Sequence, residues 1–576
     1  MNEFYKLIIK LMKFLITALG KDINYFLFIM FASIVLELVS AVIAIPLIFS
    51  LLGNEEGTPF KLPFLSGFSS NDRLLLLSLI LVFAYATVTV LRLIAMRITF
   101  ELGRRLARHT DKKLYRYIVL GYFGSVRNID SSQMVAAILQ RSSSLALVCS
   151  RVISLLCYFA IFVAILLFLS WFNVIILLYL LCMGVLMSLA VHQITRKNIY
   201  KDSSDINVLS QAIVKNIKET VSGLREVRVA GVQDVALNRF DLEEGRLRLA
   251  QREIQYYSSL PRFLVEGIGV CGLISSLAFL IYFTGDVSNS LANIGVFALL
   301  ILRILPILQF LLSCFVEIRS GSALAAACLD DLKEAADNTP VGSVEKFTSL
   351  SNSFSSLEVS QVSFKFSGSK EPLFQNVSFK ITEGDRILVS GPSGCGKSTL
   401  LELISGLDLP STGKISIYCP EGRGINLLSS IYYVSQKPLL LNDTLKDNVL
   451  LFGDKFGLDE EKALLKAIQI TELNSLVDQL GGFDARKLGE SGSGVSGGQG
   501  QRIALARAIV SERPIILLDE ATSALNDELE TAILKWLTSQ EHLTIIAVSH
   551  SESIRRWFSK ELKYSPNDKS FNIAEI

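Results

Sequence analysis

Apolar side chains dominate the first 320 residues and then give way to a mixed pattern. A helix rises about 1.5 Å per residue and the hydrocarbon core of a bilayer is about 30 Å thick, so a run of about 20 apolar residues can cross it. We predict membrane spans at residues 23–52, 74–100, 145–172, 173–195, 263–284 and 291–318. The chain is therefore expected to begin with a six-helix transmembrane domain.

Basic residues indicate which ends of these spans face the cytoplasm. The segments 101–144 and 196–259 are rich in Arg and Lys, whereas the other three connections together contain a single lysine, Lys61. Because basic loops stay on the cytoplasmic side, we expect both long loops and both termini there. The loops are helical by pattern, so the helices should project beyond the membrane and turn back at Asp130–Gln133 and around Val221–Arg225.

The pattern changes after Arg319. Residues 321–356 are a mixture of small, polar and acidic residues, and we expect a helix end followed by a linker. From residue 357 to 576, short β-type runs alternate with helical stretches, which is typical of an α/β domain. The predicted organisation is a transmembrane domain at 1–320, a linker at 321–356 and a soluble α/β domain at 357–576.

The composition supports a membrane protein and gives no sign of a nucleic-acid partner. Apolar residues make up 51% of the chain, and the mean hydropathy is +0.45. The 56 basic and 54 acidic residues leave a net charge of only +2, so we expect no binding to nucleic acid. The eight cysteines have neither metal-ligand nor disulfide-framework spacing.

A complete phosphate-binding loop lies in the α/β domain. GPSGCGKST at 391–399 follows an apolar strand and precedes a helical pattern, the order that such a loop requires. Its backbone amides can surround a β-phosphate, the Lys397 ammonium can reach the β- and γ-oxygens, and the Ser398 hydroxyl can ligate Mg²⁺. We therefore expect ATP and Mg²⁺ as cofactors. The predicted ATP contacts in this loop are Gly391, Pro392, Ser393, Gly394, Cys395, Gly396, Lys397, Ser398 and Thr399.

Two acidic residues end the apolar run PIILLDE at 514–520. Asp519 suits Mg²⁺ binding through the water ligands of the ion, and Glu520 can polarise an attacking water. An apolar run that ends in two acids is as often a strand leading into a polar loop. Its position downstream of a complete phosphate loop favours the catalytic interpretation.

A second glycine-rich stretch, SGVSGGQGQR at 493–502, also precedes an apolar helical pattern. Such a stretch leaves backbone N–H groups free to hold an anion, because the first turn of a helix has unpaired donors and a positive dipole end. The predicted contacts are Ser496, Gly497, Gly498 and Gln499. This stretch has no lysine, so its purpose beside a complete phosphate loop needs another explanation.

These motifs together resemble those of ABC transporters of the exporter type, in which a membrane domain precedes one ATPase domain. VSGGQ at 495–499 is similar to the family signature LSGGQ. The resemblance implies that Gln436 is a catalytic and Mg²⁺-contacting glutamine, that His550 is the catalytic switch histidine, and that Phe366 stacks on adenine. It also places Glu490, in LGESG, in the exporter X-loop.

The family resemblance explains the second glycine loop. In this family each ATP lies between the phosphate loop of one subunit and the signature loop of the other, which implies a homodimer that shares two ATP sites. Ser496 with the amides of Gly497 and Gly498 would close over the γ-phosphate of the partner's nucleotide. Two positions depart from the family, since Asn526 replaces a usual aspartate and Ser551 a common arginine. Neither change removes a catalytic group.

Three short stretches bear on the cargo. REVRVAG at 225–231, LPRFLVEGIG at 260–269 and LRILPILQ at 302–309 are similar to bacterial lipid-linked oligosaccharide flippases. We therefore expect ATP-driven flipping or export of a lipid-linked saccharide or similar amphipathic anionic lipid. The expected location is the bacterial inner membrane, with a cytoplasmic ATPase domain. The alternatives are an exporter of a lipid, lipopeptide or small peptide and, from another class, an ATP-gated channel or regulator.

Arginines within the predicted spans are candidate cargo ligands. A charge at the centre of a span costs about 2.5–3.5 kcal/mol on insertion scales, so each calls for a partner or a function. Arg92, Arg262 and Arg303 could face a cavity and hold an anionic head group, because guanidinium matches phosphate geometry. In the alternative interpretation, Arg92 and Arg262 reach to the membrane interface and Arg303 pairs with Glu37.

Overall fold

The structure is a computed structural model of the whole chain. It describes all residues except 1–8, 12, 15–21, 52–68, 128, 173–181, 183, 187–188, 190–192, 194–198, 285–286, 340–353, 367, 422–423, 426, 452–459, 490–493 and 550. The chain divides into two compact units. Unit 1 comprises Met1–Gly121 and Arg127–Thr339, and unit 2 comprises Tyr122–Val126 and Pro340–Ile576.

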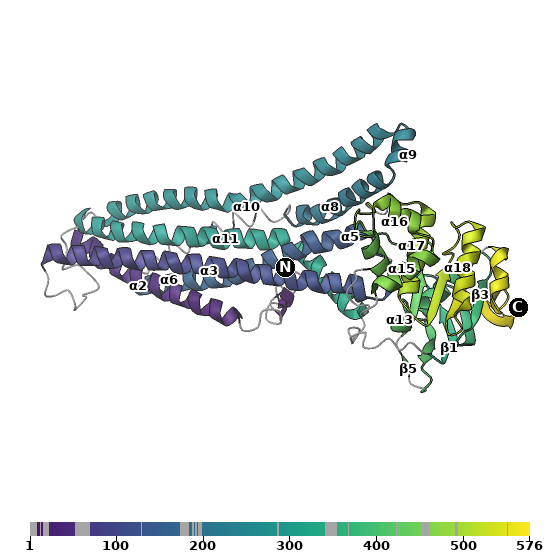
Figure 1. Cartoon of the computed structure of the whole chain (residues 1–576). Helices are drawn as coiled ribbons and strands as arrows, with labels where there is room; N and C mark the ends of the chain where they lie inside the picture. Colours follow the sequence, from purple (N-terminus) through teal and green to yellow (C-terminus); the bar gives the residue numbers. More distant parts are fainter. Residues whose placement is uncertain are drawn as a thin grey trace. The chain divides into compact units, whose positions relative to one another are not determined.

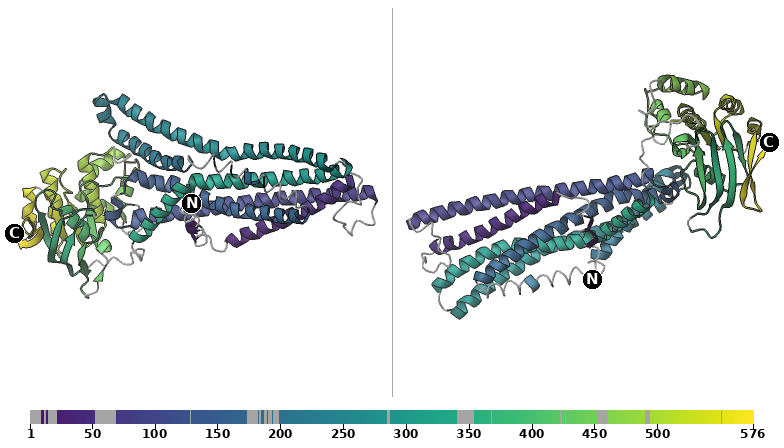
Figure 2. Two further views of the ribbon diagram at one scale, coloured as in Figure 1. Left: turned by 180° about the vertical axis from the view of Figure 1, so that it is seen from behind. Right: turned by 90° about the horizontal axis from the view of Figure 1, so that it is seen from below.

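Unit 1 is built from long helices (Figure 1). The long helices are α2 (Asp22–Leu51), α3 (Ser70–Leu120), α6 (Ser142–Phe172), α8 (Ile199–Ser222), α10 (Gln233–Thr284) and α11 (Val287–Asn338). The shorter ones are α5 (Ser131–Ala136), the π-helix η3 (Ala137–Arg141) and α9 (Leu224–Val229). Helices α3, α10 and α11 have 51, 52 and 52 residues, so they are much longer than a bilayer is thick. Figure 2 shows the same long helices from two further sides.

Four helical segments among the described residues are long and apolar enough to cross a membrane. They are Phe28–Ile48, Asn71–Leu120, Ser131–Phe168 and Arg303–Asn338. They overlap four of the predicted spans, at 23–52, 74–100, 145–172 and 291–318. The predicted span at 263–284 is helical as the last part of α10. The predicted span at 173–195 lies largely outside the described residues.

The two predicted turns have different outcomes. The turn predicted at Asp130–Gln133 is wrong: α3 already ends before Gly121, and the Asp130 side chain accepts from the Ser132 N–H (3.1 Å) to cap the start of α5. An aspartate is a favoured N-cap, so it marks the beginning of the returning helix. The turn predicted around Val221–Arg225 is confirmed, because Gly223 separates α8 from α9.

Polar contacts tie η3, α8 and α11 of unit 1 together. Arg141 of η3 forms an ion pair with Asp331 of α11 (Nη1–Oδ2, 2.7 Å) and donates from Nε to Asn207 of α8 (3.2 Å). Helices α3 and α6 also approach closely, because a Cβ on Gly103 would lie only 2.8 Å from the Ser150 hydroxyl. Unit 1 is therefore a packed bundle rather than a set of independent spans.

Unit 2 contains two sheets. The six-stranded sheet has the order β10-β9-β3-β8-β7-β6, in which only the β9–β10 pair is antiparallel, and the four-stranded antiparallel sheet has the order β2-β1-β4-β5. The strands of unit 2 are β1 (Ser356–Phe364), β2 (Phe374–Thr382), β3 (Arg386–Ser390), β4 (Thr412–Tyr418), β5 (Gly424–Ile425), β6 (Ile431–Val434), β7 (Ile515–Asp519), β8 (Thr544–Val548), β9 (Lys560–Ser565) and β10 (Ser570–Glu575). Its helices are α4 (Phe123–Arg127), whose last residue falls in unit 1, α12 (Lys397–Ile404), α13 (Leu427–Ser430), α14 (Leu445–Leu450), α15 (Glu460–Ile470), α16 (Asn474–Leu480), α17 (Gly497–Val510), α18 (Asp527–Ser539) and the 3-10 helix η5 (Glu552–Trp557).

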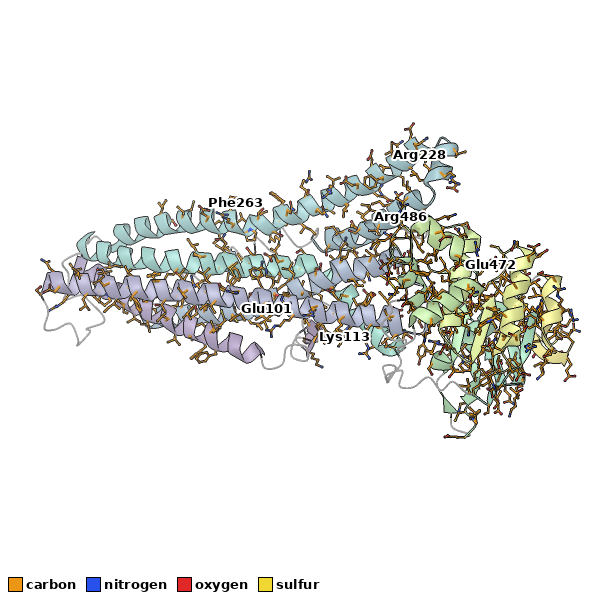
Figure 3. All side chains as sticks on the ribbon, in the orientation of Figure 1. Glu101, Lys113, Arg228, Phe263, Glu472 and Arg486 are labelled. Carbon is orange, nitrogen blue, oxygen red and sulfur yellow. The ribbon has the colours of Figure 1, made fainter. Side chains whose placement is uncertain are left out.

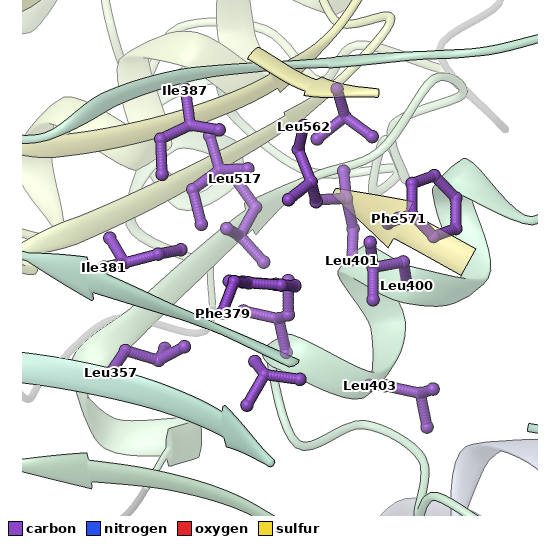
Figure 4. Packing of buried hydrophobic residues seen from close by; sticks show 14 of the residues in the cluster. Leu357, Phe379, Ile381, Ile387, Leu400, Leu401, Leu403, Leu517, Leu562 and Phe571 are labelled. Carbon is purple, nitrogen blue, oxygen red and sulfur yellow. The ribbon is translucent and has the colours of Figure 1, made fainter. Parts of the chain in front are cut away.

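Apolar clusters cover both faces of the parallel strands, as expected for a sheet buried on both sides. One cluster joins Leu517 of β7 to Leu400 and Leu401 of α12 and to the four-stranded sheet (Figure 4). The other joins Ile516 and Leu518 to helices α17 and α18. The predicted class, a helical membrane domain followed by an α/β domain, is confirmed.

Candidate nucleotide-binding site

The loop between β3 and α12 has the backbone that a phosphate loop needs. Gly394 and Gly396 have φ values of +81° and +98°, in the left-handed region that favours glycine. A Cβ on Gly396 would also lie 2.7 Å from a methyl carbon of Leu373. Both observations explain why glycine is required before the first turn of α12, whose N–H groups point toward the loop.

Lys397 is folded back into this loop. Its side chain is 8% exposed, and Nζ donates to the carbonyls of Gly391 (2.8 Å) and Pro392 (3.2 Å). These are weak partners for an ammonium compared with phosphate oxygens, so a bound phosphate can replace them. Burial raises the pKa of the neighbouring Cys395 thiol, which therefore stays neutral.

The predicted metal residues Ser398 and Asp519 are in direct contact. The Ser398 hydroxyl donates to Asp519 Oδ1 (3.1 Å), and the Tyr433 hydroxyl donates to Asp519 Oδ2 (2.8 Å). Asp519 is 6% exposed, so the two hydrogen bonds fix a nearly buried carboxylate. Hydroxyl and carboxylate oxygens are the ligands that Mg²⁺ prefers, and this donor set therefore fits the ion.

Glu520 and Gln436 also meet at this edge of the sheet. Gln436 Nε2 donates to Glu520 Oε2 (2.5 Å), and the Glu520 N–H donates to the Val548 carbonyl (3.0 Å). Glu520 has φ of +48°, a left-handed backbone conformation that is uncommon for a residue other than glycine. The structure thus brings Gln436, Asp519 and Glu520 to the phosphate loop.

Phe366, the residue predicted to stack on adenine, follows strand β1. Phe366 is 47% exposed and packs edge-to-face against Phe364, with ring centroids 5.1 Å apart. Its exposed ring leaves a face for an adenine, and the stacking role stays a prediction. His550 and Glu490 lie outside the described residues.

The second glycine loop is organised by its own helix. Ser496 and Gln499 form a reciprocal capping box at the start of α17. Gly498 lies so close to the next loop that a Cβ there would be 2.8 Å from the Ala524 carbonyl. Gln501 joins the same loop, since it donates to Ser523 (3.1 Å) and accepts from the Ala524 N–H (2.9 Å). In the part of the chain that the structure describes, no hydrogen bond joins residues 496–499 to residues 391–399.

The candidate cargo arginines of unit 1 have distinct surroundings. Arg92 forms an ion pair with Glu37 (Nη2–Oε2, 2.8 Å). Arg303 is buried, where it donates to the Tyr85 hydroxyl (2.7 Å) and to the backbone carbonyl of Glu37 (2.9 Å). Arg303 therefore contacts Glu37, as the alternative interpretation expects, but through the backbone carbonyl, while the Glu37 carboxylate pairs with Arg92. Arg262 is exposed on α10, next to the labelled Phe263 (Figure 3).

A cavity of about 560 Å³ lies within unit 1 beside Arg92. It is lined by α2, α3 and α6, with Phe310 from α11, and its walls are mostly apolar. Arg151 also lines it and forms an ion pair with Glu317. The cavity therefore combines apolar walls with guanidinium groups.

Comparison with known proteins agrees with this geometry. Residues 374–523 match the ABC transporter family. A solved structure, "Structure of a bacterial Atm1-family ABC exporter with ATP bound", aligns with a TM-score of 0.73 at 19% identity and covers 97% of this chain and 96% of that chain. The chain has the fold of that ABC exporter. Both the helical unit and the α/β unit are included in the alignment.

Curated relatives match shorter parts of the chain at higher sequence identity. The mycobactin import ATP-binding/permease protein IrtB of Mycolicibacterium smegmatis is 39% identical over 183 residues, which are 31% of each chain. The ATP-dependent lipid A-core flippase of Burkholderia pseudomallei is 27% identical over 390 residues, 66% of this chain and 63% of the relative. The flippase of the same name from Vibrio vulnificus is 28% identical over 367 residues, 62% of this chain and 60% of the relative. The alignments thus span less than two thirds of the relatives' own length.

Proposed function

We propose that this half-transporter hydrolyses ATP to move an amphipathic anionic lipid, such as a lipid-linked saccharide, across the bacterial inner membrane. The observation that carries the ATPase part is the contact network at the carboxyl end of β7, where Ser398, Asp519, Gln436 and Glu520 meet the phosphate loop. The domain assignment at 1–320, 321–356 and 357–576 belongs to the same proposal, and α11 runs through Asn338 into the proposed linker.

Each residue of the network has a distinct role in the proposed hydrolysis. Lys397 leaves its two carbonyl partners and binds the β- and γ-phosphates, which holds the nucleotide in place. Ser398 and Asp519 would hold Mg²⁺, which neutralises developing charge on the phosphates. Glu520 orients the attacking water once Gln436 no longer occupies its carboxylate. His550 is proposed to assist at the γ-phosphate.

The nucleotide sites are proposed to be completed by a second copy of the chain. The capping box leaves the signature loop, residues 495–499, at the start of α17 with its glycine amides available to an anion. Within the described residues the loop makes no hydrogen bond to its own phosphate loop. A partner's nucleotide supplies the missing phosphate, so two chains form two shared sites.

The cargo proposal rests on the cavity in unit 1. An acyl or prenyl chain suits its apolar walls, and a phosphate suits the guanidinium of Arg92, which has donors beyond the one engaged by Glu37. Arg262, which is exposed on α10, and Arg303, which is held by Tyr85 and Glu37, do not line this cavity, and a contact of Arg262 with the head group stays a prediction from the sequence. The flippase names of two relatives support a lipid cargo.

Reconstitution in liposomes tests this proposal. ATP turnover and flipping should be stimulated by polyprenyl-pyrophosphate saccharides or lipid A-type lipids and not by peptides. Arg262→Ala should lose this stimulation with nucleotide affinity intact. For Arg92 the pair must be changed together, as Arg92→Gln with Glu37→Gln, since removal of Arg92 alone would leave the buried Glu37 carboxylate unpaired, whereas the Arg92 side chain is 39% exposed and can reach water. Glu37→Gln alone is the matched control and should still transport.

Two results would favour the alternatives. Normal lipid flipping by both arginine variants would show that the cargo is not held by its phosphates, and stimulation by peptides would then indicate a peptide exporter. Ion conductance that follows ATP binding without turnover would indicate a channel. The polar network at Glu520 favours a pump, because a gate does not require a complete hydrolytic site.

A further inference from the structure

Two adjacent tyrosines on β6 point to opposite faces of the six-stranded sheet. Tyr433 lies opposite Leu517 in the parallel pairing of β6 with β7, and successive strand residues alternate between faces. Tyr433 packs against the cluster that contains Leu517 and the α12 side chains, whereas Tyr432 packs against the cluster of α17 and α18. Asp519 is two residues beyond Leu517, so it is on the Tyr433 face.

The Tyr433 hydroxyl reaches the carboxylate at the end of β7. It donates to Asp519 Oδ2 at 2.8 Å, and the Ser398 hydroxyl donates to Oδ1 at 3.1 Å. In a metal-bound site the Ser398 oxygen would turn to the ion, as the phosphate-loop chemistry requires. Of these two donors, only Tyr433 would then still hold the carboxylate.

We propose that Tyr433 is a positioning residue that fixes the rotamer of Asp519 for Mg²⁺ binding. The inference rests on the proposed function of this site as an Mg²⁺–ATP site. A carboxylate that is nearly buried and hydrogen-bonded at one oxygen has a single orientation. The other oxygen of Asp519 then already points toward the metal site, and the side chain loses no further conformational freedom when Mg²⁺ binds. A phenylalanine at this position keeps the ring in the core and removes only the donor.

Tyr432 gives a matched control on the same strand. It is also packed in the core, and its ring lies under the Arg513 guanidinium at 5.6 Å from the centroid. Burial raises the pKa of the Tyr432 hydroxyl, which stays neutral at physiological pH. Tyr432→Phe therefore removes a comparable hydroxyl from the same strand on the face away from Asp519.

The test measures metal binding directly, without turnover. Full-length protein in nanodiscs, loaded with a non-hydrolysable ATP analogue, is titrated with Mn²⁺ and followed by electron paramagnetic resonance. Tyr433→Phe should weaken Mn²⁺ affinity about tenfold, the usual effect of losing a partner that orients a metal ligand. Affinity for the analogue without metal should not change, and Tyr432→Phe should match the wild type in both measurements.

Three outcomes would overturn the inference. Wild-type Mn²⁺ affinity in Tyr433→Phe would show that Asp519 is held without the hydroxyl. An equal loss of metal-free nucleotide affinity, or the same loss in Tyr432→Phe, would show that the hydroxyl serves the fold in general. If the wild-type protein bound no Mn²⁺ with the nucleotide, the proposed function itself would fail, a result distinct from the other two.

Discussion

Arg507 anchors the helix that carries the signature loop. It lies in α17, is 5% exposed, and donates from Nη1 to the Leu439 carbonyl (2.6 Å) and from Nη2 to the Asn448 side chain (3.2 Å). Its Nε also donates to the Asn448 backbone carbonyl. One guanidinium therefore ties α17 to α14 and to the loop that precedes it.

The loss of local stability expected for Arg507→Ala follows from these contacts. Each hydrogen bond to a charged group is worth about 1.5–3 kcal/mol, and the carbonyls left behind would be partly buried. Burial also lowers the pKa of Arg507, which shows that the environment opposes its charge, and removal of the charge relieves part of the loss. We expect a net local destabilisation of about 3 kcal/mol, well below the sum of three bonds.

Amide hydrogen exchange measures this local effect, because it reports the opening free energy of each segment. Amides of α14 and α17 should exchange about 100-fold faster in Arg507→Ala, since 1.4 kcal/mol corresponds to about tenfold. The matched control is Arg502→Ala on the same helix. Arg502 donates to the carbonyl of Glu472 (2.9 Å), a contact on the surface, and Glu472 is labelled in Figure 3. Arg502→Ala should therefore lower the local stability by only about 0.5 kcal/mol or less.

Equal exchange in the two variants would refute this reasoning, because it would show that the buried guanidinium contributes no more than a surface one. Faster exchange confined to α18 would refute it as well. Among the described residues, the hydrogen bonds of Arg507 go to Leu439 and Asn448 and not to α18, so the loss would then have spread through the core rather than through these hydrogen bonds.

Three further predictions concern the ATP sites. Glu520→Gln should bind ATP yet turn over orders of magnitude more slowly, whereas Lys397→Ala should also lose nucleotide affinity; near-normal turnover by Glu520→Gln would remove its assigned role. Mixing Ser496→Arg chains with Lys397→Ala chains should restore one intact site in the mixed dimer, and no recovered ATP binding would count against shared sites. Gly498→Ala should slow turnover without loss of ATP binding at Lys397, because its Cβ would lie 2.8 Å from the Ala524 carbonyl; unchanged turnover would show that the loop yields easily.

The phosphate loop could be predicted well from the sequence because its chemistry is local. Glycines with positive φ, a lysine and a serine occur at fixed offsets between a strand and a helix, and each offset has a geometric reason. Asp519 and Glu520 were predictable for a related reason, since the carboxyl ends of parallel strands meet at one edge of a sheet, here those of β3 and β7 with β8 between them.

Tyr433 could not be found in this way. It belongs to a strand whose register against β7 is set by tertiary pairing, and nothing in the letters YYVSQ distinguishes which tyrosine shares the face of Asp519. The sequence shows that Tyr432 and Tyr433 face opposite sides of the sheet, but not which side each of them faces. Which tyrosine shares the face of Asp519 depends on which face of the sheet α12 covers.

The arginines of unit 1 show the same limit in a membrane domain. One interpretation of the sequence paired Arg303 with Glu37 because the two lie at a similar estimated depth in their spans, and the structure does bring the two residues together. Depth does not specify rotation about the helix axis, so it could not show that Arg92 takes the carboxylate while Arg303 takes only the backbone carbonyl. Pairing between spans requires the packing angles of α2, α3 and α11.

The departure at Asn526 is explained by the start of α18. Its side-chain oxygen accepts from the Leu529 N–H at 3.2 Å, which makes Asn526 the N-cap of that helix. Asparagine and aspartate are equally good N-caps, so the helix start does not depend on the usual aspartate. What the asparagine removes is a negative charge, in a first turn that already holds Asp527, Glu528 and Glu530. Those acids interact favourably with the helix dipole but repel one another, and a neutral cap reduces that repulsion without loss of the hydrogen bond. Asn526 thus keeps the N-cap hydrogen bond of α18 without adding a further negative charge to its first turn.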